Sequence, residues 1–206
     1  MDVSISPRGL PGTLTLPAGP VALVVFAHGS GSSRLSPRNT AVAEALRGKG
    51  LATLLFDLLT PPEALDRSNV FNIFLLAQRL ESAIDFLRAR GVTTGLPVGL
   101  FGASTGAAAA LVAAARRPAD VASVVSRGGR PDLAGDMLTH VRAPTLLIVG
   151  GDDAQVLALN RAAQAQLICE NRLSIVPGAT HLFEEPGALE DVARLAAEWF
   201  TNHVPD

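Results

Sequence analysis

A Gly-x-Ser-x-Gly sequence at residues 102–106 constrains the fold more than any other feature, because it separates two runs of different character. The apolar run 96–101 precedes it and the alanine-rich run 107–112 follows it, which predicts a strand, a sharp turn and a helix. Ser104 then lies at the apex of the turn in a strained conformation with positive φ. Gly102 and Gly106 allow the strand and the helix to approach closely.

This pattern is typical of a nucleophile elbow, for which a preceding strand and a following helix are the required context. The serine hydroxyl would lie at the N-terminus of a helix, where free N–H groups and the dipole favour negative charge. Alone, such a pentapeptide also arises as an ordinary loop in a chain with 19 glycines among 206 residues. The rest of the sequence must therefore supply the partners of an activated serine.

Short apolar runs alternate with longer amphipathic segments along the whole chain. The sequence predicts strands at 3–6, 13–16, 21–27, 51–56, 97–101, 121–125, 145–149 and 173–176. It predicts helices at 39–49, 71–90, 105–116, 156–167 and 189–203. The first two strands are expected to form a hairpin with Pro11-Gly12 near its turn. The alternation favours the α/β class, with a mostly parallel sheet, helices on both faces and a single domain over 1–206.

Composition excludes several classes of protein. A net charge of −2 gives no reason to expect a nucleic-acid partner, and no apolar run approaches the ~20 residues of a membrane span. The N-terminus lacks a signal-peptide pattern, so we expect a cytoplasmic location. The single cysteine, Cys169, excludes an internal disulfide and is expected to be a buried or partly buried thiol on a helix. We expect no metal and no cofactor, because metal-ligand clusters and phosphate loops are missing from the sequence.

Reactive side chains are expected where the predicted strands end, because parallel α/β sheets bind ligands at the carboxyl ends of their strands. The sequence fits this expectation, since the short runs that follow predicted strands contain His28, Asp57, Ser104, Arg127, Asp152, Asp153 and His181. A serine, an acid and a histidine appear in that order along the chain.

With these residues in place, the chain resembles the α/β-hydrolase superfamily in the compact form of dienelactone hydrolase-like proteins. The runs HGSGSSRLSPRN, FGASTGAAAA, SRGGRPDL, LLIVGGDD and VPGATHLFEEPG carry the resemblance over nearly the whole length. They are similar to a bacterial subgroup in which some members are fused to a phosphoribosyltransferase domain that this chain lacks. Dienelactone hydrolase itself has a cysteine nucleophile, so lactone specificity does not carry over to Ser104.

A catalytic triad follows from these residues. Ser104 is the expected nucleophile and needs a base within hydrogen-bond reach. We expect that base to be His181, since His28 directly precedes a glycine and is more often an anchor of its loop. The other two histidines, His140 and His203, follow a short helix and lie near the C-terminus, respectively.

The acid that orients His181 is either Asp153 or Asp152. The superfamily pattern implied by the resemblance is Gly-x-x-Asp-x-x-Val, which Gly150, Asp153 and Val156 match. Asp152 does not match it. We therefore expect Asp153 to be the acid and Asp152 to be a solvated loop carboxylate or a helix cap.

Two backbone amides are expected to form the oxyanion hole. Thr105, the residue after the nucleophile, supplies one, and Ser30 in the loop after His28 supplies the other. The glycines at 29 and 31 suit a loop whose backbone approaches a substrate, although a tight turn would also account for them.

Four arginines lie in loops at the same end of the predicted sheet: Arg34, Arg38, Arg127 and Arg130. They could bind a carboxylate or phosphate of the substrate, with Arg127 the most strongly expected to point into the site. Alternatively they form salt bridges with nearby acids, namely Asp57, Glu63, Asp132, Glu184 and Glu185. Both interpretations remain open from the sequence.

Superfamily members often carry a lid where this chain has only the short segment 130–141, so we expect a minimal lid or none and an open site. The loop 58–70 could form one wall instead. The expected function is a serine hydrolase that cleaves a small, possibly anionic, carboxylic ester through an acyl-enzyme. The alternatives are a thioesterase, amidase or acyltransferase with the same triad, or a non-catalytic binding module on this scaffold. The expected partner is a small-molecule ester, and the sequence does not define the oligomeric state.

Overall fold

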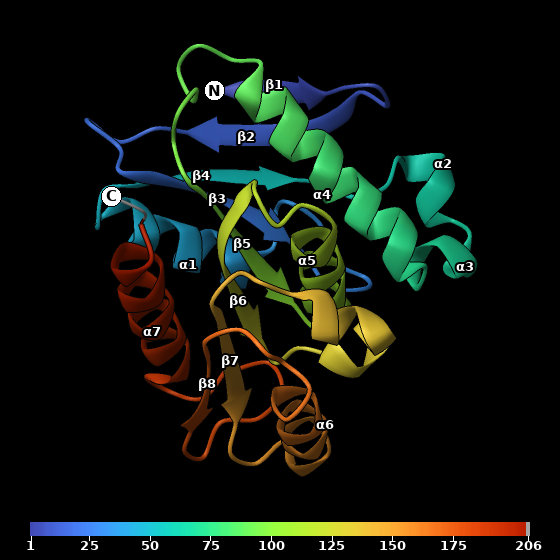
Figure 1. Ribbon diagram of the computed structural model, residues 1–206, viewed down its shortest axis with the longest axis vertical. Coiled ribbons are helices and arrows are strands. Elements are labelled where there is room, and N and C mark those ends of the chain that lie inside the picture. Colours follow the sequence, from blue (N-terminus) through green and yellow to red (C-terminus); the bar gives the residue numbers. More distant parts are fainter. Residues whose placement is uncertain (205–206) are drawn as a thin grey trace.

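The computed structural model describes residues 1–204 and contains one eight-stranded sheet in the order β1-β2-β4-β3-β5-β6-β7-β8 (Figure 1). The strands are β1 (Asp2–Ile5), β2 (Leu10–Thr15), β3 (Ala22–Ala27), β4 (Leu51–Phe56), β5 (Val98–Ala103), β6 (Val121–Arg127), β7 (Thr145–Gly150) and β8 (Asn171–Val176). The pairs β1–β2 and β2–β4 are antiparallel, and all later pairs are parallel. The predicted α/β class with a mostly parallel sheet is confirmed.

Helices cover both faces of the sheet (Figure 1). Two of them, α1 (Pro37–Arg47) and α7 (Ala188–Asn202), lie side by side on one face. The other face carries α4 (Ile73–Arg88), α5 (Thr105–Arg116) and α6 (Ala154–Gln164). Three short elements complete the fold: α2 (Pro61–Ala64), α3 (Arg67–Val70) and the 3₁₀ segment η1 (Pro131–His140) between β6 and β7.

Each face of the sheet has its own hydrophobic core, which explains why the central strands are continuous apolar runs rather than alternating ones. On the α4–α5 side, Leu80 and Leu111 are fully buried against the sheet. On the α1–α7 side, the rings of Phe26 and Phe101 lie 4.8 Å apart, and Phe200 of α7 belongs to the same buried cluster. The central strand β5, which leads to Ser104, is therefore held firmly from both sides.

The N-terminal hairpin forms, but the prediction that Pro11-Gly12 lies near its turn is wrong. The turn occupies residues 6–9 and includes Gly9 at φ 67°, while Pro11 and Gly12 lie inside β2. A Cβ added to Gly12 would lie 3.0 Å from Phe56 Cβ, so this glycine permits close strand packing and makes no turn. A Pro-Gly pair suits both a hairpin turn and a closely packed strand, and the sequence alone did not distinguish these two roles.

Several other boundaries differ from the prediction in ways that local chemistry explains. The helix predicted at 39–49 begins at Pro37, because the side chain of Ser36 caps it, and the one predicted at 71–90 begins after the cap Asn72. The segment predicted as the loop 58–70 contains α2 and α3. Cys169 is half-buried but lies between α6 and β8, so its predicted place on a helix is wrong.

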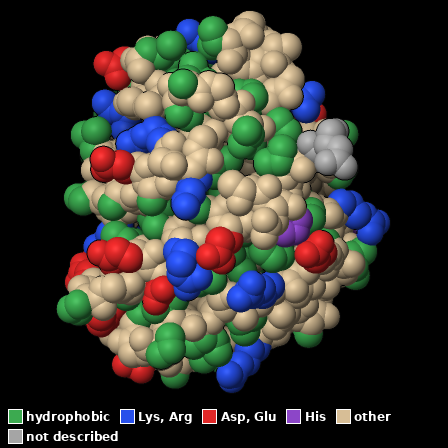
Figure 2. Space-filling model, turned by 90° about the vertical axis from the view of Figure 1, so that its left-hand side faces the viewer, with side chains coloured by type: hydrophobic (Ala, Val, Ile, Leu, Met, Phe, Trp, Pro, Cys, Tyr) green, Lys and Arg blue, Asp and Glu red, His purple; other side chains and the backbone are tan. Residues whose placement is uncertain are grey.

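Within residues 1–204, no helix is both long and apolar enough to cross a membrane. The same residues contain no group of three or more potential metal ligands gathered in space. Figure 2 shows the face that carries α1 and α7, where basic and acidic side chains are interspersed with hydrophobic ones. This face therefore presents no large field of one sign.

Candidate active site

Ser104 occupies a sharp turn between β5 and α5. Its backbone angles are φ 51° and ψ −119°, and it is one of two non-glycine residues with positive φ in the described chain. The Ser104 amide donates to the carbonyl of Arg127 (3.2 Å), and its carbonyl accepts from the amide of Arg130 (3.1 Å). These bonds hold a backbone conformation that costs about 1–3 kcal/mol elsewhere. The serine is thus presented at the first turn of α5.

The two glycines of the motif are required by close backbone approach. A Cβ on Gly102 would lie 2.4 Å from the Cα of Ala107, and one on Gly106 would lie 2.2 Å from the carbonyl oxygen of Ala27. Contacts this short do not occur for real side chains, so only glycine fits at either position. The two glycines of the motif are therefore explained by the steric requirements of the turn.

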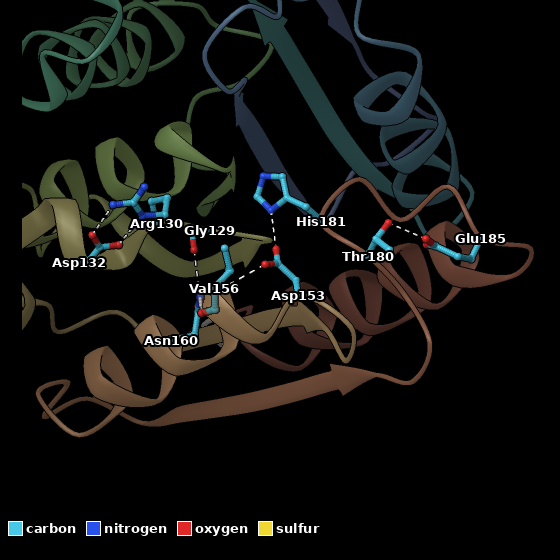
Figure 3. A network of polar contacts seen from close by, with 9 residues as sticks. All are labelled: Gly129, Arg130, Asp132, Asp153, Val156, Asn160, Thr180, His181 and Glu185. Atoms are coloured by element: carbon cyan, nitrogen blue, oxygen red, sulfur yellow. Dashed lines mark hydrogen bonds and ion pairs between the residues drawn. The ribbon is translucent and has the colours of Figure 1, made fainter.

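His181 and Asp153 come together from the ends of β8 and β7 (Figure 3). His181 Nδ1 lies 2.7 Å from Asp153 Oδ2, and the other carboxylate oxygen accepts from the amide of Val156 at the start of α6 (3.3 Å). An ionised carboxylate only accepts, so Nδ1 donates to it, and in the neutral imidazole Nε2 is then the nitrogen that can accept a proton. The Asp153 side chain is 14% exposed and the His181 side chain 39%, so the acid is sheltered and the imidazole is accessible.

Ser104 and His181 both adjoin the loop 127–130, which follows β6. The backbone of Ser104 bonds to residues 127 and 130, while a Cβ on Gly128 would lie 3.2 Å from the His181 carbonyl oxygen and 3.5 Å from its Nδ1. Between these two residues the structure contains no hydrogen bond from Ser104 Oγ to the imidazole. Such bonds often tighten only when substrate is bound.

The competing candidates lie in other surroundings. Asp152 is exposed and contributes a backbone bond from its amide to the carbonyl of Ala179 (3.0 Å). His140 is exposed at the end of η1, and His203 packs on the ring of Trp199 near the C-terminal end of α7. Of the residues weighed as acid and base, the structure brings together Asp153 and His181.

His28 is held by its own loop. Its Nδ1 lies 3.0 Å from the carbonyl oxygen of Gly29, and its Nε2 accepts from the amide of Leu58 (3.2 Å). Burial lowers the pKa of His28, and the Gly29 carbonyl and the charge of Asp57 oppose that shift. Both ring nitrogens are therefore engaged with backbone groups, as expected of an anchor between the β3 and β4 loops.

The two predicted oxyanion donors lie next to each other. The Ser30 amide donates to the side-chain hydroxyl of Thr105 (3.0 Å), and Thr105 is buried at the first position of α5. The first amides of a helix have no partner within it, so the Thr105 amide is available to a ligand. Gly29 lets the loop reach the serine, because a Cβ there would lie 3.1 Å from Ser104 Cβ.

Three of the four candidate arginines pair with acids. The pairs are Arg34–Asp57 (2.9 Å), Arg38–Glu184 (2.9 Å) and Arg130–Asp132 (2.7 Å). Figure 3 shows the last of these beside the loop that adjoins Ser104. These contacts match the salt-bridge interpretation of the three residues.

Arg127 differs from the other three. Its side chain is buried, donates to Asn39 Oδ1 on α1 (3.3 Å) and lies over the ring of Phe183. Its Nε is buried with no hydrogen-bond partner among residues 1–204. Burial, with the nearby charge of Arg38, lowers the pKa of Arg127 to about 10. The guanidinium therefore lies beneath α1, where it has no carboxylate partner in the described chain.

One positioning residue was missed by the sequence analysis. Asn160 on α6 is fully buried, and its Nδ2 donates to the carbonyls of Gly129 (2.9 Å) and Val156 (2.8 Å) (Figure 3). It thereby ties the loop beside Ser104 to the helix that Asp153 caps. The available signal was a polar residue at a helical position otherwise occupied by core side chains.

A cavity of about 280 Å³ opens beside the predicted oxyanion donors, between the loop after β3 and the α2–α3 segment. Gly29, Ser30 and Thr105 are among its lining residues. A larger hollow of about 620 Å³ lies between α1 and α7 and has none of the predicted site residues in its lining. We therefore associate the smaller cavity with Ser104.

Comparisons with known proteins agree with this architecture. A crystal structure of a dienelactone hydrolase from Anabaena variabilis matches with a TM-score of 0.96 and 57% identity, covering 100% of this chain and 97% of that one. Est1E from Butyrivibrio proteoclasticus matches with a TM-score of 0.83, covering 98% of each chain, and its 17% identity shows the fold alone.

Two curated relatives come from Mycobacterium tuberculosis, strains CDC 1551 and H37Rv. Each is named "Putative phosphoribosyl transferase" and is 60% identical over 204 residues, which are 99% of this chain and 46% of the relative. The chain thus spans less than half the length of these relatives. The sequence model of the dienelactone hydrolase family matches residues 17–203, nearly the entire length. The chain therefore belongs to the dienelactone hydrolase family.

Proposed function

We propose that this protein is a serine hydrolase that cleaves small carboxylic esters through an acyl-enzyme formed on Ser104. The observation that carries the proposal is the 2.7 Å contact between His181 Nδ1 and Asp153 Oδ2, across the 127–130 loop from a serine at positive φ. A neutral serine hydroxyl is a weak nucleophile, and an oriented imidazole is the group that activates it.

In the proposed reaction, Ser104 Oγ forms a bond to the ester carbonyl carbon while His181 Nε2 accepts the hydroxyl proton. Asp153 stabilises the imidazolium and keeps it in the productive tautomer. The tetrahedral oxyanion is stabilised by the amide of Thr105 at the N-terminus of α5. The Ser30 amide donates to the Thr105 hydroxyl in the structure (3.0 Å), so it joins the oxyanion hole only by exchanging that bond for one to the oxyanion. The C–O bond to the alcohol then breaks, and His181 gives its proton to the departing oxygen. A water molecule then attacks the acyl carbon and gives a proton to His181 Nε2. The bond from that carbon to Ser104 Oγ breaks, His181 returns the proton to Oγ, and the carboxylic acid departs.

The same residues suit thioesters, amides and transfer of an acyl group to another acceptor, because these reactions share the acyl-enzyme and differ in leaving group or acceptor. We place the oxyester before the amide because alcohols leave with less assistance than amines. A non-catalytic binding module on this scaffold is the alternative from another class. The name of the M. tuberculosis relatives concerns proteins more than twice this length, so phosphoribosyl transfer is outside our proposal.

The test is labelling with a fluorophosphonate, followed by intact-mass measurement of the wild type and Ser104→Ala. We expect a single adduct on the wild type and none on the variant, with circular dichroism showing that both are folded. An oxyester, a thioester and an amide of one acyl group then rank the leaving groups. A folded wild type that gains no adduct and cleaves none of the three would contradict the proposal and favour a binding module.

An anionic substrate is the alternative to a neutral one, and it depends on Arg127. This is the one arginine of the four candidates without an acid partner in the described part of the chain. If it serves the substrate, Arg127→Met lowers kcat/KM for a dicarboxylic monoester and spares the neutral ester of the same length. An equal effect on both esters assigns Arg127 a structural role only.

A further inference from the structure

The cavity beside Ser30 has mostly apolar walls. It lies at the carboxyl ends of β3 and β4, on the side of the molecule that carries α2 and α3 (Figure 1). Its apolar lining comes from Leu58, Leu59, Pro61, Ala64, Val70 and Leu76. At about 280 Å³ it is just below the ~300–1,000 Å³ of pockets for drug-sized ligands, so it suits a short chain.

The charged groups of the lining are already satisfied. Asp57 accepts from the backbone amide of Arg34 (2.7 Å) and from its Nη1 (2.9 Å), so both carboxylate oxygens are engaged. His28 makes two backbone contacts, and burial lowers its pKa, which favours the neutral imidazole. A charged ligand group would have no free counter-charge here, whereas an apolar chain loses nothing on entry.

The cavity lies next to the nucleophile, although Ser104 itself is not one of its lining residues. Gly29 lines it, and a Cβ at Gly29 would lie 3.1 Å from Ser104 Cβ. Thr105, which follows the nucleophile, also lines it and accepts from the Ser30 amide. The cavity is therefore the space nearest to a group attached to Ser104 on the β3 side of the serine.

The sheet order decides which part of an ester occupies the cavity. Ser104 follows β5, His181 follows β8, and the cavity lies beyond β3 and β4 on the opposite side of β5. The alcohol must depart beside His181, because that residue supplies its proton. The acyl chain consequently points the other way, toward β3 and β4.

We propose that this cavity is the acyl pocket and that the preferred substrates are esters of short, unbranched, apolar carboxylic acids. The inference rests on the proposed function and adds the substrate class. The alcohol portion faces the open side near His181 and contributes little to selectivity.

The outer wall of the pocket is fixed by Glu63. Its carboxylate accepts from the amide of Thr60 (2.9 Å) and from Arg79 of α4 (2.8 Å), while its carbonyl accepts from Asn69 Nδ2 (3.0 Å). Arg79 is only 7% exposed, so the ion pair is sheltered. Because these contacts hold α2 and α3 in place, the side chains of Ala64 and Val70 set the size of the pocket.

The experiment varies acyl length at fixed alcohol, using p-nitrophenyl esters from acetate to decanoate. In the wild type, kcat/KM is expected to rise roughly fourfold per methylene, from ~0.8 kcal/mol per buried methylene, and to fall once the pocket is full. Ala64→Trp is expected to move the optimum to shorter acids, and Val70→Ala to longer ones. Ala45→Trp is the matched control, because Ala45 is an exposed helical alanine that lines the α1–α7 hollow instead.

A second ester series varies the alcohol at a fixed acyl group and is expected to change kcat/KM less than threefold. The pocket assignment is overturned if Ala64→Trp and Val70→Ala both keep the wild-type ranking of acids, or if selectivity follows the alcohol. The assignment is also overturned if Ala45→Trp changes the ranking of acids as much as Ala64→Trp and Val70→Ala do.

Binding to Ser104→Ala separates this inference from the proposed function. Calorimetry with butyrate, hexanoate and octanoate measures occupation of the pocket without turnover. If the wild type neither labels nor cleaves esters, the proposed function fails, yet affinity that rises with chain length in Ser104→Ala and falls in Ser104→Ala/Ala64→Trp still supports the pocket. Affinity independent of chain length overturns it.

Discussion

The two sides of Ser104 are lined by different types of residue. Toward β7 and β8 lie ionisable side chains, with Asp153 sheltered and His181 accessible at 2.7 Å from it. Toward β3 and β4 lie glycines, serines and apolar side chains, and the two ionisable residues among them are already engaged. Asp57 is paired with Arg34, and both ring nitrogens of His28 contact backbone groups. One side is suited to moving a proton, and the other to holding a neutral chain.

The difference shows that the two sides of one serine can meet two separate chemical requirements, proton transfer and binding of an apolar chain. Proton transfer creates a positive charge on the imidazole, so it needs a carboxylate that is already oriented to stabilise that charge. Recognition of an apolar chain needs the reverse, namely an environment in which no charge is left unpaired. The β5–α5 turn separates the two environments, so neither compromises the other.

The strongest test of the proton-transfer side is Asp153→Asn. We expect kcat for ester hydrolysis to fall about 10³–10⁴-fold, because the amide no longer stabilises the imidazolium or fixes its tautomer. Asp152→Asn is the matched control and should stay within threefold of the wild type, since that residue is exposed. Stopped-flow ester hydrolysis measures both. The reverse ranking would place the acid at residue 152.

Gly106→Ala tests the junction of the two sides. The added Cβ would lie 2.2 Å from the Ala27 carbonyl, so we expect the free energy of unfolding to drop by about 3 kcal/mol or more. Gly91→Ala serves as control, because a Cβ there meets nothing within 4 Å. Urea denaturation provides the measurement. Similar values for the two variants would mean that β3 and α5 move apart easily.

Thr105→Val tests the recognition side. The variant keeps the shape and removes the acceptor of the Ser30 amide, so the loop loses one bond worth ~0.5–1.5 kcal/mol. We expect kcat to fall about two- to tenfold, with Thr105→Ser near the wild type because it retains the hydroxyl. Steady-state kinetics on one ester distinguishes them. Equal losses in both variants would point to the methyl group of Thr105 and its packing.

The smallest expected effect concerns pH and His28. Its pKa is lowered in the folded state, so the unfolded chain takes up the proton first as pH falls below 6.5, and stability declines from that point. The nearby Asp57 opposes the shift. In His28→Gln we expect a shallower decline of the free energy of unfolding below that pH, measured by urea titration at several pH values. Identical slopes would assign the decline to other groups.

The fold was largely predictable, because the apolar runs and their alternation with amphipathic segments specify a parallel sheet covered on both faces. The partnership of Asp153 with His181 was indicated by strand-end positions and by the resemblance. The role of Pro11-Gly12 was not predictable, since turns and tight strand packing favour the same two residues. Helix boundaries moved to the capping residues Ser36 and Asn72, whose effect depends on local geometry.

Other parts of the site could not be predicted from local sequence patterns, because they depend on tertiary contacts. The ion pair of Arg79 with Glu63 joins two elements that no sequence spacing relates, and Asn160 reaches Gly129 only through tertiary packing. The arginines at 34, 38 and 130 could be placed at the right end of the sheet, but their acid partners depend on loop conformation. The bond from the Ser30 amide to the Thr105 hydroxyl joins two loops far apart in the sequence, and no spacing indicates it.

The sheet order has a consequence for how such enzymes diversify. In our proposal, most of the pocket lining comes from residues up to 70, while the acid and base come from the segments after residue 150. Recombination within the family can therefore exchange residues 58–70 between relatives and alter which acids are accepted while leaving the proton relay intact.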